Sequence, residues 1–481
     1  MRRLRFVRLL LWLVAAPLLL RAAGSFEGTW TGRISGPQSE TALGLAFVPA
    51  PDGLLVSVDF PEMFLHSVNF GPAEIRDETF TLAPLGLSVS LQGDRLSGTF
   101  GPAALPVELH RGGTFTPPPP PPAPPSAPAP LWSRSVGSPV WATPAVAGDT
   151  VFVAAIDGSL HALQTGDGAE LWSWTGPHPL YGEPLVTADA VYLVDERCDL
   201  VCVDRARGTL RWRVPLHDAT LAGAPAPSNE TFNHRATKPV LDERGILYVG
   251  STDGGLYAVR ADRARILWRH DLKARVYAPV AVRGNDLVVA CFDGSVVTLN
   301  RRTRRESSRV KLGGALASAP VIAGDRVILG CRDYMLYALT PRGDTAWRRS
   351  FWFSWVESTP RLADGTLYIG GSDFRRISAL DAQSGAARWA TDVLGLSWGT
   401  PVVTADTVFA ATAGQHLAGT VIQHRGGIAA LDRATGEWIW RFAAPVTDGA
   451  EFSGYTNSLA IAGDRLVAAG VDGVVLALPL R

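Results

Sequence analysis

The chain has 481 residues, of which 47% are hydrophobic and 19% are charged, a composition typical of a folded globular protein and not of a disordered one. Lysine plus arginine and aspartate plus glutamate both number 45, so the formal net charge is zero. This balance argues against a nucleic-acid-binding protein, which usually carries a basic excess, and gives no reason to expect an electrostatic field for acidic substrates.

The first 24 residues predict a signal peptide. Four arginines precede an apolar run over residues 9–20, and small residues follow at 22–25, as in export signals. The apolar run is too short for a comfortable membrane span, so we expect cleavage near residues 22–25, with an uncleaved anchor as the alternative. No cysteine offers a site for lipid attachment. The mature protein is therefore expected to be periplasmic or extracellular, without an integral membrane span.

Residues 26–115 predict a small antiparallel β-barrel. Short stretches such as FEGTWTG, LLVSVDF and LSVSLQG alternate apolar and polar residues and are separated by Gly, Pro, Asp and Asn, which is the pattern of half-buried strands joined by turns. FEGTWTG at the start and GDRLSGTF with LPVELHR at the end resemble the lipocalin-like barrel found ahead of some secreted bacterial hydrolases. No Gly-x-Ser-x-Gly motif follows, so the resemblance implies the barrel and not the hydrolase activity.

Residues 116–130 predict a linker, because residues 117–130 contain only Pro, Ala and Ser. Proline fixes φ and removes a hydrogen-bond donor, which favours the extended polyproline II conformation. At ~3.1 Å per residue the segment would span about 40 Å as a semi-rigid spacer.

From residue 131 the chain repeats with a period near 40 residues. The seven tryptophans that mark the repeat are Trp132, Trp172, Trp212, Trp268, Trp347, Trp389 and Trp440. Ser308 stands where an eighth would fall between 268 and 347. Longer steps after 212 and 389 indicate insertions, at 217–238 and 411–427. Eight repeats with several short strands each are typical of a β-propeller.

The last repeat lacks its fourth strand, since the sequence VVLALPLR supplies only the third. Residues 131–136, LWSRSV, precede the first complete repeat and can supply the missing strand. Such closure removes two exposed sheet edges. The predicted fold is therefore all-β: an eight-bladed β-propeller over 131–481 with N-terminal strand closure, preceded by the small antiparallel β-barrel.

The phrase ALDRATGEWIW at 430–440 returns as ALDAQSGAARW at 379–389, and in partial form at 162–172, 202–212 and 258–268. Glycine permits positive φ at the turn, aspartate accepts hydrogen bonds from turn amides, and a recurrent tryptophan suits packing between blades. The phrase resembles the tryptophan-docking motif of the quinoprotein-like, PQQ-repeat propellers. We therefore interpret the seven marking tryptophans as structural joints between blades.

The resemblance suggests two alternative functions, a quinone-dependent dehydrogenase and a non-enzymatic scaffold. Quinoprotein dehydrogenases of this family hold pyrroloquinoline quinone and Ca²⁺ on the propeller axis, and the alcohol-oxidising ones usually carry adjacent disulfide-bonded cysteines. This chain has no adjacent cysteines and short loops, so we expect no catalytic residues, cofactor or metal. The resemblance points instead to non-enzymatic, BamB-type scaffolds, although those are lipoproteins without the barrel or the spacer. An exported scaffold for a protein or cell-envelope ligand is the favoured function, and a PQQ-dependent oxidoreductase is the alternative.

Aromatic residues recur just before the inner strand of several repeats. The candidate ligand or partner surface comprises Trp141, Tyr181, Tyr277, Trp355, Glu357, Trp398 and Tyr455. Rings gathered around a propeller channel suit protein recognition or carbohydrate binding, although they could also simply plug the channel. The protein is expected to act as a monomer without nucleic acid.

Two further groups receive structural interpretations. Cys198, Cys202, Cys291 and Cys331 allow three full pairings in an oxidising compartment, and small buried thiols are the simpler explanation. The basic run at 301–309, RRTRRESSR, is expected to be a solvated turn.

Overall fold

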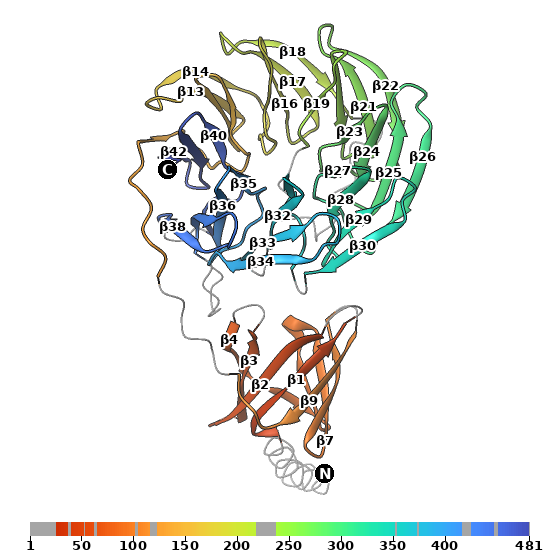
Figure 1. The fold of residues 1–481 in the computed structure, drawn as a ribbon, viewed down its shortest axis with the longest axis vertical. Coiled ribbons are helices and arrows are strands. Elements are labelled where there is room, and N and C mark those ends of the chain that lie inside the picture. Colours follow the sequence, from red (N-terminus) through yellow and green to blue (C-terminus); the bar gives the residue numbers. More distant parts are fainter. Residues whose placement is uncertain are drawn as a thin grey trace, which may run out of the picture. The chain divides into compact units, whose positions relative to one another are not determined.

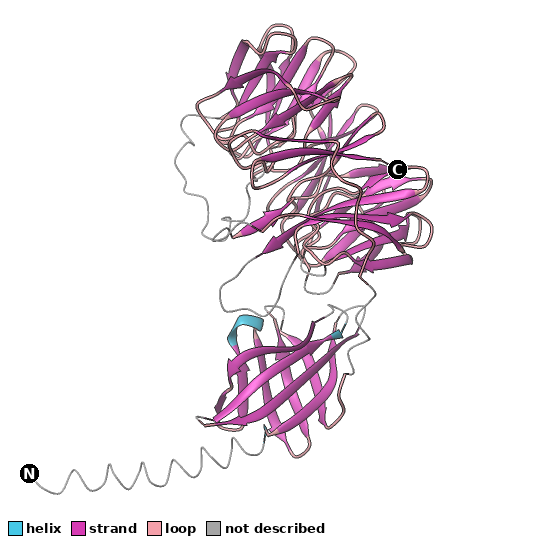
Figure 2. Ribbon diagram, turned by 90° about the vertical axis from the view of Figure 1, so that its left-hand side faces the viewer, coloured by secondary structure: helices cyan, strands magenta, loops and turns pink. Residues whose placement is uncertain are grey.

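The computed structural model describes residues 26–36, 40–51, 53–61, 65–101, 104–115, 123–217, 237–351, 354–372, 375–415, 425–446 and 451–480. The signal segment at 1–24 lies outside them, as do the central parts of both insertions. The described chain forms two compact units that divide between Ala123 and Pro124. Strands make up nearly all of the regular structure in both units (Figures 1 and 2), and no helix among the described residues is long and apolar enough to cross a membrane.

The first unit is one antiparallel sheet of nine strands that curls into a nearly closed barrel (Figure 1). Its strands are β1 Gly28–Ser35, β2 Glu40–Ala50, β3 Gly53–Phe60, β4 Leu65–Pro72, β5 Glu74–Arg76, β6 Thr79–Leu82, β7 Leu87–Gln92, β8 Arg95–Phe100 and β9 Leu105–Arg111. The sheet order is β4-β3-β2-β1-β9-β8-β7-β6-β5. Burial alternates along β3, as expected for a sheet with one face in the core. The predicted barrel is confirmed.

The barrel core is built around Trp30, which is fully buried. Its indole nitrogen donates to the carbonyl of Phe26 at 2.8 Å, and the guanidinium of Arg111 lies 4.2 Å from the ring centroid. Phe47 packs edge-on against both Phe26 and Phe80. The FEGTWTG segment therefore starts the barrel because its aromatic residues anchor the first strand in the core.

The second unit is a propeller of eight blades, each a four-stranded antiparallel sheet (Figure 1). Blades 1 to 4 comprise β11 Ala145–Ala147, β12 Thr150–Ala154, β13 Ser159–Gln164 and β14 Glu170–Thr175; β15 Leu185–Val186, β16 Ala190–Val194, β17 Asp199–Asp204 and β18 Leu210–Pro215; β19 Val240–Leu241, β20 Ile246–Gly250, β21 Gly255–Arg260 and β22 Arg265–Asp271; and β23 Ala281–Arg283, β24 Asp286–Ala290, β25 Ser295–Asn300 and β26 Glu306–Lys311.

Blades 5 to 7 follow in the same order. They comprise β27 Val321–Ala323, β28 Arg326–Gly330, β29 Met335–Leu339 and β30 Thr345–Ser350; β31 Arg361–Ala363, β32 Thr366–Gly370, β33 Arg376–Asp381 and β34 Ala387–Asp392; and β35 Val402–Val403, β36 Thr407–Gln415, β37 Gly427–Asp432 and β38 Trp438–Ala443. A short extra strand, β39 Phe452–Gly454, pairs with the extended end of β36.

Blade 8 is closed by the N-terminal strand of the propeller. It contains β40 Ala460–Ala462, β41 Arg465–Ala469 and β42 Val474–Pro479, and its fourth strand is β10 Trp132–Ser135, which pairs with β42 from Trp132 opposite Ala477 to Ser135 opposite Val474. The predicted eight blades and their closure are confirmed.

The two middle strands of each blade are buried on both faces, because each blade packs between two others. In blade 1, four of the five residues of β12 and five of the six of β13 are buried, whereas the outer strand β14 is exposed or half-buried throughout. This explains why the middle strands read as continuous apolar runs in the sequence. At the tight hairpins between them, Asp157 and Asp253 accept hydrogen bonds from the amides of Ser159 and Gly255.

The end of the proline-rich segment pairs with the propeller. The amide of Ala127 donates to the carbonyl of Arg441 at 2.9 Å, and the amide of Arg441 donates to Pro125 at 2.8 Å. Ser126 thereby forms a parallel bridge with Arg441 in β38, the outer strand of blade 7. Residues 125–127 cover an edge that would otherwise be open to pairing, so this end of the segment expected to be a spacer is attached to the propeller.

Candidate binding faces of the propeller

The strand order gives the propeller two different ends. In every complete blade the turn from the first to the second strand and the turn from the third to the fourth lie at one end, which we call the turn face. The hairpin between the middle strands and the loop into the next blade lie at the other end, which we call the loop face. This follows from antiparallel pairing of consecutive strands. The repeated phrase forms part of the turn face, and the candidate aromatic residues lie on the loop face.

On the turn face, tryptophans of the outer strands dock onto the turn of the next blade. Four indole nitrogens donate to a backbone carbonyl of that turn: Trp132 to Thr165 at 2.9 Å, Trp172 to Arg205 at 3.0 Å, Trp347 to Ala382 at 3.3 Å and Trp389 to Arg433 at 3.0 Å. The glycine of the phrase lies against each ring. A Cβ added to Gly436 would stand 2.6 Å from the Trp389 ring, so both positive φ and close packing require glycine there.

The aspartate of the phrase organises the same turn. Oδ1 of Asp381 accepts from the amides of Gln383 and Ser384 and from the Ser384 hydroxyl. These hydrogen bonds, above all that from the Ser384 hydroxyl, lower the pKa of Asp381 to about 2. Asp432 accepts equivalent bonds from Ala434 and Thr435, and its pKa is also lowered by them. The phrase is therefore a joint, as the sequence suggested.

The remaining marking tryptophans pack against an aromatic residue of the second strand of their own blade, as Trp172 and Trp389 also do. Trp440 is buried and packs against Phe409, with ring centroids 5.8 Å apart. Trp212 and Trp268 are partly buried against the cores shared with the next blades. The turns that they face have Ala264 and Arg304 in place of glycine, both with positive φ, at 51° and 59°. The joint is therefore not identical around the ring.

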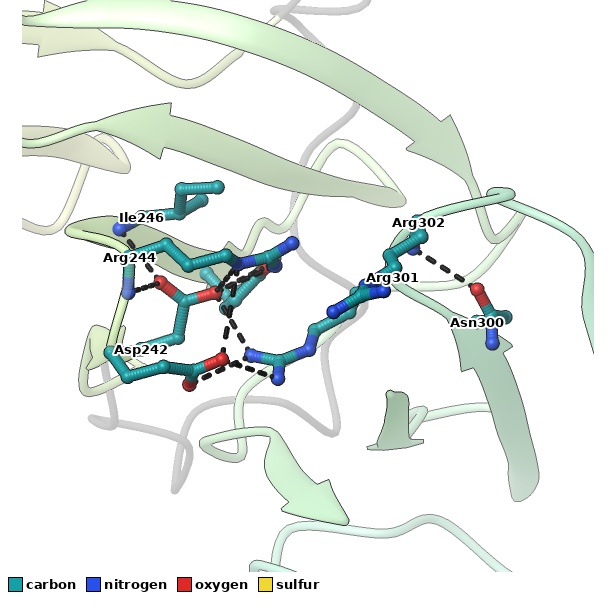
Figure 3. A network of polar contacts seen from close by, with 8 residues as sticks. Asp242, Arg244, Ile246, Asn300, Arg301 and Arg302 are labelled. Carbon is teal, nitrogen blue, oxygen red and sulfur yellow. Dashed lines mark hydrogen bonds and ion pairs between the residues drawn. The ribbon is translucent and has the colours of Figure 1, made fainter. Parts of the chain in front are cut away.

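The basic run at 301–309 is not simply a solvated turn. Arg301 is buried, and its guanidinium pairs with Asp242 at 2.9 Å and Glu243 at 2.8 Å in the preceding blade (Figure 3). Arg309 pairs with Glu306 at 2.6 Å within its own blade. A guanidinium can be buried when carboxylates satisfy its donors, and the sequence alone did not show that these carboxylates were adjacent.

On the loop face, Trp141 and Trp398 are brought together by a residue that the sequence analysis missed. Phe452 in β39 packs edge-on against both rings, with centroid distances of 5.7 Å to Trp141 and 5.6 Å to Trp398. Trp141 precedes blade 1, Phe452 precedes blade 8 and Trp398 precedes blade 7. We call these three residues the tryptophan cluster. Both tryptophans are half-buried, so part of each ring is accessible.

A second group, which we call the arginine cluster, lies over blades 4 to 6. Phe292 packs edge-on against Tyr277 with centroids 5.0 Å apart. The guanidinium carbon of Arg332 lies 5.1 Å from the Phe292 ring centroid and 4.4 Å from that of Trp355. Nε of Arg332 donates to Glu357 at 2.6 Å. Glu357 is therefore engaged by an arginine that is itself held between two rings.

The other two candidate residues, Tyr181 and Tyr455, lie before blades 2 and 8. Tyr181 is half-buried before blade 2, and burial with the nearby Glu196 raises its pKa. Tyr455 is almost fully buried in the core shared by blades 7 and 8, so its role is in packing and not at the surface. Phe452, Phe292 and Arg332 could have been suspected from their places in loop-face segments, but no repeat marks them.

All four cysteines are free and buried. Burial raises the pKa of Cys202 to about 11 and that of Cys291 to about 12, which keeps both thiols protonated at neutral pH. The Cys331 thiol donates to the carbonyl of Gly314 at 3.3 Å. The simpler of the two interpretations, small buried thiols, agrees with this placement.

Residues 127–233, 199–354 and 336–481 match the family described as outer membrane protein assembly factor BamB. The chain belongs to this BamB family. The assembly factor BamB of Burkholderia pseudomallei is 24% identical over 377 residues, covering 72% of this chain and 86% of that protein.

Two further proteins are similar to part of the chain. The beta-alanine-activating enzyme of Danio rerio is 28% identical over 131 residues, 26% of this chain and 11% of that enzyme, so the chain spans about a tenth of its length. The quinohemoprotein alcohol dehydrogenase of Comamonas testosteroni superposes with a TM-score of 0.57 at 14% identity, over 73% of this chain and 76% of that one. At this identity the likeness shows a shared fold.

Across the described residues no group of three or more His, Cys, Asp or Glu side chains gathers as a metal site. Glu357, the acidic residue singled out on the loop face, is paired with Arg332.

Proposed function

We propose that the protein is an exported, non-enzymatic scaffold whose loop face binds a protein partner of the cell envelope. The observation that carries the proposal is the tryptophan cluster, in which Phe452 holds two half-buried tryptophans from separate loops. Tryptophan, tyrosine and arginine dominate the binding energy of protein interfaces, and the arginine cluster offers the same residue types on the same face. Membership in the BamB family supports a scaffold over an oxidoreductase.

Site-specific photo-crosslinking tests the proposal. A photoreactive phenylalanine analogue at position 398 is expected to yield a discrete protein adduct in cells. The same analogue at position 464, whose native aspartate side chain is 83% exposed and lies on the turn face, is the matched control. Adding Phe452→Ala should abolish the adduct at 398, because the tryptophan cluster loses its central ring. Equal adducts at both positions, or an adduct at 398 unaffected by Phe452→Ala, would contradict the proposal.

Absence of a cofactor, a monomeric state and export are parts of the same proposal. Native mass spectrometry of the purified protein mixed with pyrroloquinoline quinone and Ca²⁺ should give the mass of one chain and no bound quinone. The N-terminal sequence of that protein should begin near residues 22–25 if the signal is cleaved. A retained quinone with dye reduction on adding an alcohol would favour the oxidoreductase alternative.

A further inference from the structure

Three joints on the turn face share an arginine that reaches back into the preceding blade. The residue directly after the Asp or Asn of the turn is Arg205 in blade 2, Arg301 in blade 4 and Arg433 in blade 7. Arg205 donates to the carbonyl of Ala147 at 2.8 Å, and its guanidinium carbon lies 5.9 Å from the centroid of the Phe152 ring. The Arg205 guanidinium thus lies beside an aromatic residue of the second strand of blade 1 and donates to a carbonyl oxygen of that blade.

In the other two joints the arginine pairs with a carboxylate of the preceding blade. Arg433 donates to the hydroxyl of Tyr368 at 3.0 Å and to the carboxylate of Asp364 at 2.5 Å, with 5.8 Å between its guanidinium carbon and the Tyr368 ring centroid. Figure 3 shows Arg301 extending from its own turn toward Asp242. Asp242 in turn accepts from the hydroxyl of Tyr248 at 3.0 Å.

The aromatic residue that receives the arginine is the third residue of the second strand. Five blades have an aromatic residue there: Phe152, Tyr192, Tyr248, Tyr368 and Phe409. Phe152 and Tyr368 lie beside an arginine, Tyr248 shares Asp242 with Arg301, and Phe409 shares its core with Leu480. For Tyr192 in blade 2, the corresponding residue of blade 3 is Ala261, which has no side chain long enough to reach the ring.

A cleft of about 390 Å³ lies at this joint. Its walls include Tyr192 and Thr187 from blade 2, Trp212 from the outer strand of blade 2, and Leu241 and Ala261 from blade 3. Asp189 also lines the cleft, in the same turn of blade 2 as Asp364 in blade 6. The aromatic ring and the turn are thus present, and Arg211 of blade 2, which also lines the cleft, already engages the Asp189 carboxylate. What differs from the other joints is that the turn of blade 3 supplies no arginine, because Ala261 stands at that position.

We propose that this cleft receives the arginine side chain of a partner polypeptide, which completes the joint between blades 2 and 3 from outside. Asp189 is ionised at neutral pH, because the hydrogen bond from Arg211 lowers its pKa. Arg211 donates to Oδ2 of Asp189 at 2.6 Å, and Arg260 pairs with Asp262 at 3.0 Å. The charged side chains that line the cleft therefore have no net charge. An incoming guanidinium is therefore held by stacking and by carbonyl and hydroxyl oxygens as much as by charge.

This site lies on the turn face, so it is independent of the loop-face function proposed above. The chemistry required is a planar cation with several donors, which selects arginine over lysine. A cleft that opens at the surface on the side of the blade turns is reachable by a side chain from a partner, whereas the internal arginines of the other joints are supplied in cis.

Binding of N-acetyl-arginine-amide to the full chain, measured by ligand-observed NMR, tests the proposal. A dissociation constant on the order of 1 mM is expected for one side chain in a small cleft, with at least tenfold weaker binding of N-acetyl-lysine-amide. Ala261→Arg should abolish binding and raise the melting temperature, because it supplies the missing group in cis. No saturable binding to the wild type, or equal binding to wild type and Ala261→Arg, would overturn the proposal.

Two variants serve as controls for fold and site. Ala382→Arg places the same side chain at the joint between blades 5 and 6, where Ile328 is the third residue of the second strand, and it should not raise the melting temperature. Arg205→Ala should open a second cleft beside Phe152 and add a binding site for the arginine amide. If Ala261→Arg lowers the melting temperature as Ala382→Arg does, the geometry is not that of an arginine site.

The source of the arginine is distinguished by the ligand series. A partner polypeptide predicts that a Gly-Arg-Gly peptide with blocked ends binds at least as tightly as free arginine. Preference for free arginine would make the cleft a metabolite site and would overturn the assignment to a partner.

Discussion

Two joints of the propeller differ in how neighbouring blades are fastened. Between blades 6 and 7, Trp389 donates to Arg433, rests on Gly436 and lies 6.0 Å from the Tyr368 ring. Between blades 4 and 5, Ser308 replaces the tryptophan, and the Cβ position of Gly343 lies 2.3 Å from Cγ2 of Val310. Val310, two residues further along the outer strand, therefore makes the contact with the turn of blade 5. The core between these two blades is filled by aliphatic residues such as Val288 and Leu339.

The comparison shows that the joint is a repeated solution and not an obligatory one. In a repeat protein the stability is approximately a sum of local terms and neighbour interfaces, so one interface can change its chemistry while the ring persists. The tryptophan joint combines a ring, a glycine and an aspartate, and each contribution can be removed separately.

The largest expected effect is that of Trp389→Ala, which should cost about 3 kcal/mol of unfolding free energy through lost packing and the lost indole hydrogen bond. Ser308→Ala at the equivalent position of the other joint should cost less than about 0.5 kcal/mol, typical of a surface substitution. Denaturant unfolding followed by tryptophan fluorescence and circular dichroism measures both. Similar losses in the two variants would show that the tryptophan is not the main fastening.

Gly436→Ala is expected to have the next largest effect, about 2 kcal/mol, because it combines left-handed backbone strain with overlap against the Trp389 ring. Gly463→Ala is the matched control, since Gly463 also has positive φ, at 62°, but has no atom within 4 Å of an added Cβ. Its cost should be about 1 kcal/mol. The difference between the two melting temperatures measures the contacts of the added methyl group with the Trp389 ring and with Thr391 Oγ1, and it should shrink in a Trp389→Ala background.

Ser308→Trp tests the comparison by adding a tryptophan to the joint between blades 4 and 5, which lacks one. If Val310 has replaced the tryptophan, the added indole has no glycine surface to rest on, and stability should fall by about 1 kcal/mol through overpacking. Thermal unfolding of Ser308→Trp beside wild type gives the answer. A rise in melting temperature would mean that the joint between blades 4 and 5 is merely missing its tryptophan.

The sequence predicted those features of the fold that recur in every repeat. The eight blades, the closure by residues 131–136 and the joint function of the phrase all followed from periodicity and turn chemistry, because the same local contacts recur at each blade. Phe452, Phe292 and Arg332 were missed, since their importance comes from neighbours on other blades that no spacing announces. Arg301 was assigned to solvent for the same reason: Asp242, 59 positions earlier, is its partner.

The smallest effect concerns pH and the aspartate of the phrase. The pKa of Asp381 is lowered to about 2 by the Ser384 hydroxyl, Arg388 and the turn amides. A group with a lowered pKa in the folded state stabilises the fold above its ordinary pKa of 3.8, and this contribution is lost as pH falls toward 2. Asp381→Asn keeps an oxygen acceptor for the turn but cannot ionise, so the variant should lose less stability than wild type between pH 5 and pH 3.

Urea unfolding midpoints at these two pH values measure the difference, with Asp464→Asn as the control because Asp464 is an exposed aspartate paired to Arg465. A parallel pH response of wild type and Asp381→Asn would show that the charge of the phrase aspartate does not contribute. In that case its hydrogen-bond geometry alone would account for its part in the joint between blades 5 and 6. The same substitution at Asp432, whose pKa is lowered by Thr435, should have a smaller effect in the same direction, because Ile439 stands where Arg388 adds to the lowering at Asp381.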